Sequence, residues 1–234
     1  FLGAGSLFLA NDFAKTILSD INGHLINSFE RIKESPEEIH SKLNVHRKKL
    51  SEEYYYKVRS QFNKNPDLFD FNQAARFIFL VHTSFNGIYR VNKQGQYNVP
   101  VGKLNPALPS LDHLRQVSKK LQAAELMNCF YDEIDVMVEK NDFIYLDPPY
   151  PALNETSFFQ HYTIDRFSDS EQKNLLTFVE KLDKLKAKIL ISNADTKLIR
   201  GLFRDFKIVK LETTRFVSCK SARLKVNELL IRNY

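Results

Sequence analysis

The order of apolar and polar residues divides the chain into short segments with either strand or helix periodicity. Near the N-terminus, Thr16–Ser19 is typical of a short strand that ends at Asp20. The next segment, Asn22–Lys33, has apolar residues at helical spacing, and Pro36 begins a second predicted helix that runs to about Leu50. The apolar face of the first helix is made by Leu25, Ile26, Phe29 and Ile32.

Strand and helix patterns alternate again in the C-terminal half of the chain. The helix predicted over Ser168–Lys184 opens with a capping box, in which Ser168 is the N-cap and Glu171 lies three residues further on. Alternation of this kind predicts an α/β fold in which helices cover a mostly parallel sheet. The predicted strands of this half are Leu126–Tyr131, Phe143–Asp147, Lys188–Ser192, Phe206–Leu211 and Val226–Ile231.

The middle of the chain, residues 53–124, breaks this alternation. It contains one strongly apolar predicted helix, Asn72–His82, and several turn signals. These are Asn86-Gly87, Gln94-Gly95, Asn98-Val99-Pro100 and Pro106–Pro109. A hairpin is predicted near Ile88–Val99. We therefore expect this middle segment to form an inserted subdomain, and residues 1–52 and 125–234 to form the main domain.

The composition is that of an ordinary globular protein. Of the 234 residues, 43% are apolar and 26% are charged, and no apolar run approaches the roughly 20 residues of a membrane span. The net charge of +6 is compatible with a polyanionic partner but does not require one. Cys129, Cys219 and the scattered histidines have no metal-binding or redox spacing, so we expect a reduced, cytoplasmic setting and no metal site.

The chain opens with Phe1-Leu2-Gly3-Ala4-Gly5-Ser6, which places two of its seven glycines one residue apart. Glycine lets the backbone approach a ligand closely, and in open α/β sheets ligands bind at the carboxyl ends of strands. Asp20 ends the next predicted strand, where a carboxylate can accept hydrogen bonds from ribose hydroxyls. A tight turn with a helix-capping aspartate explains the pair equally well. The third glycine of the dinucleotide fingerprint is absent, which argues against a nicotinamide enzyme.

A second motif, Tyr145-Leu146-Asp147-Pro148-Pro149-Tyr150, surrounds the end of a predicted strand. Its two prolines fix the backbone and remove two N–H donors, which holds the carbonyl groups of Asp147 and Pro148 in place. The Asp147 carboxylate and the Pro148 carbonyl can each accept one N–H of an exocyclic amino group, and Tyr150 can stack on the ring that carries this group. The alternative is a strand-ending Pro-Pro turn with Tyr150 in the core.

Together with the insert, these two motifs resemble the Dam-like, D12 class of DNA N6-adenine methyltransferases. The order of the parts is similar: the glycine motif, an acid followed by isoleucine and asparagine, the insert, and then Asp-Pro-Pro-Tyr. The insert resembles the family in Thr83–Arg90, with its Phe-Asn-Gly sequence, and in Gln96–Gly102, with its Asn-Val-Pro sequence. Similarity in Leu190–Asn193 and Val226–Leu230 extends the resemblance over essentially the whole chain.

The resemblance implies a class I S-adenosylmethionine-dependent methyltransferase fold, which is Rossmann-like with a mostly parallel seven-stranded sheet and a DNA-recognition insert. It also implies a site-specific enzyme that methylates N6 of a flipped adenine in double-stranded DNA, within GATC. The implied catalytic residues are Asp147, Pro148, Pro149 and Tyr150. The implied cofactor-binding residues are Phe1, Gly3, Gly5, Ser6, Asp20, Ile21 and Asp147.

The resemblance assigns five DNA contacts to the insert. Phe85 is expected to wedge into the base stack beside the flipped adenine, and Asn86 to support the vacated position. Ile88 and Pro100 would touch thymine methyl groups, and Arg90 would reach a guanine edge. A Phe-Asn-Gly sequence at a hairpin tip would expose the ring, whereas the alternative role of Phe85 is that of a hairpin-core aromatic.

Two further segments resemble parts of the family. Lys220 and Arg223 belong to a basic loop near the C-terminus, for which a DNA contact and a solvated basic turn are equal alternatives. The segment Pro151–Phe167 is expected to form a loop over the target pocket, although its aromatic residues suit packing equally well. These aromatic residues include Phe158, Phe159 and Tyr162.

The chain departs from the family in two places. It lacks an initiator methionine and the family's Lys-Trp-x-Gly-Gly-Lys segment, so we expect residues upstream of Phe1. The family often has an acid after its third strand, facing the cofactor adenine, but here the stretch is Asn128–Asp132, in which Asp132 is the nearest acid.

Two other classes of protein stay open at this point. One is an RNA or protein amino-methyltransferase, in which Asn-Pro-Pro-Tyr is the common motif, and the other is a non-catalytic DNA-binding module. The expected partners are duplex DNA and S-adenosylmethionine, with no membrane. A cognate restriction endonuclease would be a genetic partner in a restriction-modification pair, and a DNA-bound enzyme would associate with the nucleoid.

Overall fold

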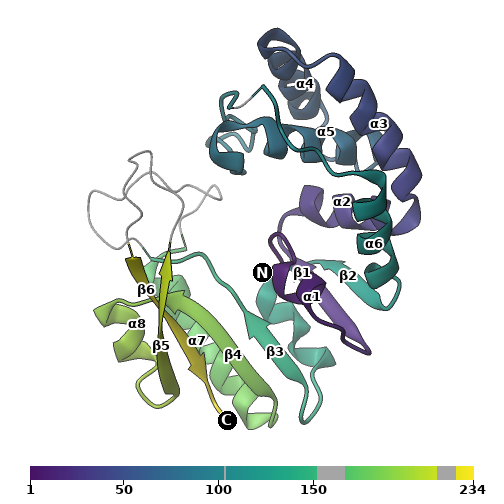
Figure 1. The fold of residues 1–234 in the computed structure, drawn as a ribbon. Coiled ribbons are helices and arrows are strands. Elements are labelled where there is room, and N and C mark those ends of the chain that lie inside the picture. The colour runs from purple at the N-terminus through teal and green to yellow at the C-terminus, as the bar shows by residue number, and fades with distance from the viewer. Residues whose placement is uncertain (103, 152–166, 215–224) are drawn as a thin grey trace. The chain divides into compact units, whose positions relative to one another are not determined.

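The computed structural model describes residues 1–102, 104–151, 167–214 and 225–234 (Figure 1). These residues form two compact units. The N-terminal unit is Leu2–Tyr131, and the C-terminal unit is Phe1 together with Asp132–Tyr234. Both units combine helices with strands, which confirms the predicted α/β class.

The N-terminal unit consists of one pair of parallel strands and a set of helices. The strands are β1 (Thr16–Asp20) and β2 (Ala124–Asn128), and the helices are α1 (Ser6–Ala10), α2 (Gly23–Glu34), α3 (Pro36–Lys48), α4 (Glu52–Lys64), α5 (Phe71–Thr83) and α6 (Leu111–Leu121). Helix α2 packs on both strands and α6 packs on β2. In the parallel register Asp20 lies opposite Asn128, so the carboxyl ends of the two strands meet.

Side-chain caps fix where the long helices of this unit begin. A cap accepts hydrogen bonds from backbone N–H groups that have no partner inside the helix. The predicted helices after β1 and from Pro36 are confirmed, whereas α4 and α6 were not predicted from the pattern. The N-caps are Asn22 for α2, Ser35 for α3, Ser51 for α4, Asp70 for α5 and Ser110 for α6.

A single apolar core joins helices from inside and outside the insert. Ile39 and Leu43 of α3, which precedes residues 53–124, are fully buried together with Tyr55 of α4 and Phe79 of α5. The hydroxyl of Tyr55 donates to the carbonyl of Val99 at 2.9 Å, which ties the hairpin segment to α4. The insert therefore shares its hydrophobic core with the helices before it.

The hairpin predicted near Ile88–Val99 is present as a tight turn with one isolated antiparallel bridge. Val91 pairs with Tyr97, and the N–H of Asn92 donates to the carbonyl of Gln96 at 2.8 Å. The expectation that Phe-Asn-Gly forms the hairpin tip is wrong. Helix α5 ends before the extended residue Ser84, and these residues form a separate 3-10 turn after it, η1 (Phe85–Gly87), in which Asn86 has a left-handed φ of 57°.

The C-terminal unit contains a four-stranded sheet in the order β3-β4-β6-β5. Strands β3 and β4 are parallel, whereas β6 is antiparallel to both β4 and β5. The elements are the 3-10 segment η2 (Tyr131–Met137), which starts at the last residue of the other unit, and β3 (Phe143–Leu146), α7 (Asp169–Lys184), β4 (Lys188–Ala194), α8 (Lys197–Leu202), β5 (Lys207–Thr214) and β6 (Lys225–Arg232).

The prediction of a mostly parallel seven-stranded sheet is wrong for the described strands. They form two separate sheets, and two of the three pairings in the larger sheet are antiparallel. Only residues 215–224 separate β5 from β6, and a parallel connection needs about a dozen residues or more. Apolar periodicity locates a strand but does not give its direction. The strand predicted over Leu126–Tyr131 is also displaced, because β2 is Ala124–Asn128.

Buried and more exposed side chains alternate along β3, so the two faces of the larger sheet differ. Ile144 and Leu146 are buried, in line with buried residues of β4 and β6, and α7 packs on β4 (Figure 1). Tyr145 and Asp147 therefore lie on the opposite face. The predicted capping box of α7 is confirmed, with Ser168 and Glu171 bonding to each other's backbone N–H groups.

Within the described residues, none of the helices combines the length and the apolar character needed to cross a membrane. The same residues contain no group of three or more His, Cys, Asp or Glu side chains arranged to hold a metal ion.

Two half-buried histidines of the N-terminal unit lie against aromatic rings. His24 lies 4.5 Å from the ring of Phe62, and His46 stacks at 4.8 Å on Phe79. Burial is the main cause that lowers the pKa of each imidazole from 6.5 to about 4. As pH falls below 6.5, these histidines gain protons in the unfolded chain but stay neutral in the folded protein, so the unfolded state binds more protons.

We therefore expect the free energy of unfolding to fall as pH decreases from about 6.5 to about 4, by roughly 2 kcal/mol per histidine by pH 5. The double variant His24→Gln/His46→Gln should lose most of this dependence in denaturant unfolding followed near pH 7.5 and near pH 5. His113→Gln, at an exposed position of α6, is the matched control. A double variant with the wild-type pH dependence would contradict the assignment.

Candidate active site

Hydrogen bonds join the glycine motif to Asp20 in the N-terminal unit. Gly3 and Gly5 have φ values of 53° and 68°, in the left-handed region that favours glycine. The Oδ2 atom of Asp20 accepts from the N–H groups of Leu2 at 2.9 Å and Gly3 at 3.1 Å. Its Oδ1 atom accepts from the N–H of Asn22 at 2.9 Å. Asp20 thus fixes the glycine turn against the end of β1.

This turn fits the cofactor that the motif implies. A Cβ added to Gly3 would meet no atom within 4 Å, so the backbone there is open to a ligand. The Oδ2 atom of Asp20 already accepts two bonds, whereas Oδ1 accepts one and has a second lone pair for a bond from a hydroxyl group. Ser6 and Ile21 are also exposed, Ile21 at 48%. Phe1 belongs to the C-terminal unit, where its ring packs edge-on against Phe167 at 5.8 Å.

Asn128 occupies the end of β2, where the expected acid is absent. Its Nδ2 atom donates to the carbonyl of Asp20 at 2.9 Å and to that of Ile21 at 3.0 Å. An amide therefore ties the ends of the two parallel strands together. Asp132, the nearest acid in the sequence, begins the C-terminal unit.

In the C-terminal unit, Ser192 on β4 holds the carboxylate of Asp147. The hydroxyl of Ser192 donates to Asp147 Oδ1 at 2.5 Å and lies 3.0 Å from the hydroxyl of Tyr145. Burial raises the pKa of Tyr150 to about 12, with a smaller opposing effect from a hydrogen bond to Ser192. The phenol is therefore neutral at physiological pH. Ser192 was not among the predicted site residues, although it is the first polar side chain after Lys188-Ile189-Leu190-Ile191.

A buried amide network holds the Pro-Pro turn. Gln172 of α7 is fully buried, and its Nε2 atom donates to the carbonyl of Pro149 at 3.2 Å. The Oε1 atom of Gln172 accepts from Nδ2 of buried Asn193 at 3.2 Å. Within the described ranges no donor lies on the carbonyl of Pro148, whereas that of Pro149 is occupied. The Pro148 carbonyl and the Asp147 carboxylate are thus two fixed acceptors at the end of β3.

The predicted DNA-contacting residues of the insert lie close together in the N-terminal unit. The N–H of Phe85 donates to the carbonyl of Pro100 at 3.0 Å, which joins the two segments that the sequence singled out. The Phe85 ring is 44% exposed, so it is not a core aromatic. Arg90 donates from Nε to Asn98 Oδ1 at 2.8 Å, and Ile88 is half-buried between these segments.

Gly102 lets the Phe85 turn lie directly against the following strand-like segment. A Cβ built on Gly102 would lie 2.5 Å from the carbonyl oxygen of Ser84 and 2.8 Å from Cα of Phe85. Its N–H donates to the carbonyl of Thr83 at 2.8 Å. Only glycine permits this approach of two backbones.

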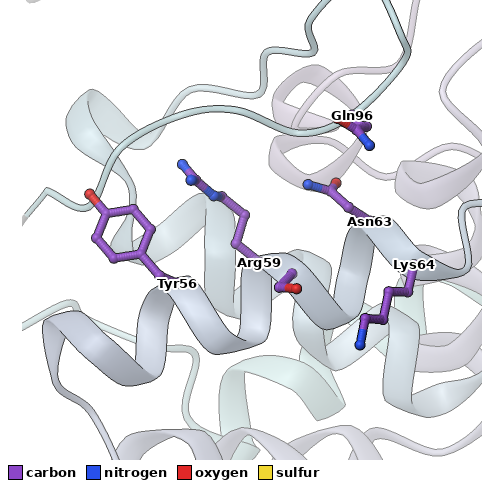
Figure 2. Close-up of a pocket in the computed structure, with 6 residues that line it drawn as sticks. Tyr56, Arg59, Asn63, Lys64 and Gln96 are labelled. Atoms are coloured by element: carbon purple, nitrogen blue, oxygen red, sulfur yellow. The ribbon is translucent and has the colours of Figure 1, made fainter.

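A groove beside α4 adds positive charge to the insert (Figure 2). Arg59 lies with its guanidinium 4.7 Å from the ring centroid of Tyr56 and donates to the carbonyl of Val99 at 3.0 Å. Figure 2 shows that the labelled residues Tyr56, Arg59, Asn63 and Lys64 project from one helix, with Gln96 facing them from a neighbouring segment. Two cations next to amide donors suit an anion such as a phosphate group. Periodicity did not point to this groove, because it lies on the polar face of an unpredicted helix.

Lys220 and Arg223 lie outside the described residues, as do Phe158, Phe159 and Tyr162. Their predicted contacts stay predictions from the sequence.

Each unit contains part of what an amino-methyltransferase needs. The C-terminal unit has a fixed carboxylate and carbonyl pair after β3, and the N-terminal unit has a glycine turn beside an acid and an exposed aromatic turn. A family model described as D12 class N6 adenine-specific DNA methyltransferase matches residues 1–217. The chain belongs to this family and is an enzyme, a DNA adenine methyltransferase.

Individual relatives cover nearly the same span. The type II methyltransferase M.MjaIII of Methanocaldococcus jannaschii is 37% identical, over 100% of this chain and 86% of the relative. The DNA adenine methylase of Haemophilus influenzae is 32% identical, over 98% of this chain and 82% of the relative. The retron Ec67 DNA adenine methylase of Escherichia coli is 30% identical, over 96% of this chain and 78% of the relative.

Membership confirms the resemblance and decides against the two other classes, the RNA or protein amino-methyltransferase and the non-catalytic module. The family implies a class I methyltransferase fold, S-adenosylmethionine as methyl donor and DNA as substrate.

We expect Gly102→Ala to lower the free energy of unfolding by about 1–3 kcal/mol and to weaken DNA binding, because the new methyl group must displace the backbone of Phe85. Urea unfolding and titration with a fluorescent duplex check this. Gly201→Ala in α8 is the matched control, since a Cβ there would meet nothing within 4 Å. Wild-type stability and DNA affinity in the Gly102 variant would show that the close approach is unimportant.

Proposed function

We propose that this enzyme transfers a methyl group from S-adenosylmethionine to N6 of adenine within GATC in duplex DNA, after flipping the base out of the helix. The observation that carries the proposal is the pair of acceptors after β3. The Asp147 carboxylate is held by Ser192 at 2.5 Å, and the neighbouring Pro148 carbonyl is left open among the described residues.

The chemistry of adenine explains why two acceptors are needed. The lone pair of adenine N6 is delocalised into the ring, so this nitrogen is a poor nucleophile. Hydrogen bonds from its two N–H groups to Asp147 and to the Pro148 carbonyl favour a tetrahedral nitrogen. The lone pair of such a nitrogen is no longer delocalised into the ring and is free to attack a methyl group. The neutral phenol of Tyr150 offers a flat face for the flipped base, whose unstacking costs a few kcal/mol. This catalysis consists of positioning and electrostatics, with Pro149 fixing the turn.

Residues of the N-terminal unit are proposed to hold the cofactor. S-adenosylmethionine supplies an electrophilic methyl group when it is bound. The open backbone at Gly3, in the turn that Gly5 completes, suits its amino-acid part, and the remaining lone pair on Asp20 Oδ1 suits a ribose hydroxyl. Ser6 and Ile21 of the same unit are also proposed to bind the cofactor, and the sequence motifs assign this role to Phe1 and Asp147 of the C-terminal unit as well.

The insert is proposed to read the DNA. The exposed ring of Phe85 suits insertion into the base stack, next to Asn86. Ile88 and Pro100 are proposed to contact thymine methyl groups and Arg90 a guanine edge, which gives the GATC preference. The cationic groove at Arg59 and Lys64 supports a phosphate contact, and Lys220 and Arg223 are proposed to add others.

The genetic setting is a separate part of the proposal. One relative bears the name type II methyltransferase, and from this we propose a cognate restriction endonuclease as genetic partner, with both enzymes acting on DNA in the cytoplasm. An absence of any endonuclease gene beside the methyltransferase gene would contradict this part.

The proposal is tested by transfer of tritiated methyl groups from S-adenosylmethionine to duplexes that contain GATC, GTTC or GATATC. We expect label in the adenine of GATC and at most about a fifth of that rate in the others, because each mismatched pair costs about 1–3 kcal/mol, a factor of roughly 5 to 150. Equal labelling of all three duplexes would keep the enzyme class and exclude the GATC preference.

In the same assay, Asp147→Ala should lower kcat by about 100-fold to 1,000-fold or more, because one of the two fixed acceptors for N6 is lost. Its affinity for the GATC duplex should stay within about twofold of wild type. Asp205→Ala, at an exposed carboxylate on the same unit, is the matched control and should keep wild-type kcat. Loss of duplex binding in a folded Asp147 variant would contradict this division of roles.

A further inference from the structure

We infer that Phe69, in the loop between α4 and α5, forms one wall of the site for the adenine ring of S-adenosylmethionine. The inference rests on the proposed function, because it takes the glycine turn and Asp20 as the place where the cofactor binds. Phe69 belongs to neither the glycine motif nor the Asp-Pro-Pro-Tyr motif, and it lies within the insert.

Phe69 lies beside the turn that connects β1 to α2. A Cβ built on Gly23 would lie 3.0 Å from Cζ of Phe69 and 3.1 Å from Oδ1 of Asn128. Gly23 is the first residue of α2, three residues after Asp20, and Asn128 donates to the carbonyl of Asp20. The Phe69 ring is therefore at the carboxyl ends of β1 and β2, the edge where open α/β sheets bind their ligands.

The ring is held in this position by residues of α2. His24 lies 5.5 Å from the Phe69 ring centroid. Asn27, a buried residue one turn further along α2, donates from Nδ2 to the carbonyl of Asp70 at 3.2 Å. Asp70 in turn caps α5 by accepting from the N–H of Gln73 at 2.7 Å. These bonds connect the backbone next to Phe69 to α2 and to α5.

Despite these contacts, the Phe69 side chain is 49% exposed, and Ile21 beside Asp20 is 48% exposed. An aromatic ring and a branched aliphatic side chain next to a carboxylate suit a ligand that joins a flat apolar ring to a sugar. The ring of such a ligand covers the apolar surface, while the sugar hydroxyls reach Asp20.

The nucleoside of the cofactor fits this surface better than a DNA nucleotide does. Asp20 is negatively charged and would repel a phosphate group at the same place. The adenosine of S-adenosylmethionine carries no phosphate, so its ribose hydroxyls can bind a carboxylate without this repulsion. The insert therefore supplies a residue to the cofactor site as well as residues to the DNA.

The experiment measures the Kd of S-adenosylhomocysteine, a stable analogue of the cofactor, by calorimetry on the intact protein, together with the Kd of a GATC duplex. We expect Phe69→Ala to raise the Kd of S-adenosylhomocysteine about tenfold and Phe69→Tyr to leave it within about twofold, because tyrosine keeps the ring face. Leu68→Ala, at the exposed neighbouring residue, is the matched control and should change this Kd by less than about twofold. The Kd of the duplex should not change in any of these variants.

A second variant tests the position of the ring. Gly23→Ala adds a methyl group 3.0 Å from Cζ of Phe69, so it should also raise the Kd of S-adenosylhomocysteine. Its effect should shrink in the Phe69→Ala background, where the ring is gone, which gives a non-additive double-mutant cycle.

A folded Phe69→Ala protein with the wild-type Kd for S-adenosylhomocysteine would overturn the inference and leave the proposed function standing. Additive effects of Gly23→Ala and Phe69→Ala would also overturn it. A wild-type protein that binds no S-adenosylhomocysteine, with or without duplex, would overturn the proposed function and this inference with it.

Discussion

The carboxylate of Asp20 is the constraint on which the candidate cofactor site of the N-terminal unit depends. It accepts hydrogen bonds from the N–H groups of Leu2, Gly3 and Asn22. Charge-assisted bonds of this kind are stronger than neutral ones, and here they join the glycine turn, the end of β1 and the start of α2. Because Asn22 also caps α2, the position of the whole helix follows from the same carboxylate. Asp20 therefore holds the backbone around it and is also a candidate cofactor-binding residue, and the two roles use different lone pairs of its carboxylate.

The C-terminal unit fixes the carboxylate proposed for catalysis, that of Asp147, in a different way. Asp147 is an exposed side chain that directly follows β3. The hydroxyl of Ser192 on the neighbouring strand bonds to its carboxylate, and the amide of Gln172 holds the following turn through Pro149. Preorganised acceptors of this kind avoid the entropy loss of ordering them during the reaction. Parallel pairing of β3 and β4 brings Ser192 beside Asp147, which shows that the sheet is part of the site.

The sequence located most helices and strands because their apolar residues recur at regular spacing. It missed α4, where three tyrosines and several charged residues obscure the apolar face of Tyr55, Val58 and Phe62. The antiparallel direction of β6 could not be predicted, because local periodicity is the same in both directions. In the candidate site, the motifs pointed to Asp20 and Asp147 through residue type and order. They could not point to Ser192 or Phe69, whose places depend on strand pairing and on packing between distant segments.

The insert shares a hydrophobic core with the helices before it, so it is not a separable module. A sequence that interrupts a strand–helix alternation suggests a separable module, yet Tyr55 and Phe79 of the insert are buried with Ile39 and Leu43 of α3. Removing residues 53–124 would expose that core, so the insert and α3 fold as one body. Helix α2 packs on α5 of the insert and carries its cap, Asn22, on the carboxylate of Asp20. Helix α2 therefore contacts both the insert, through α5, and Asp20, the acid proposed to bind the cofactor.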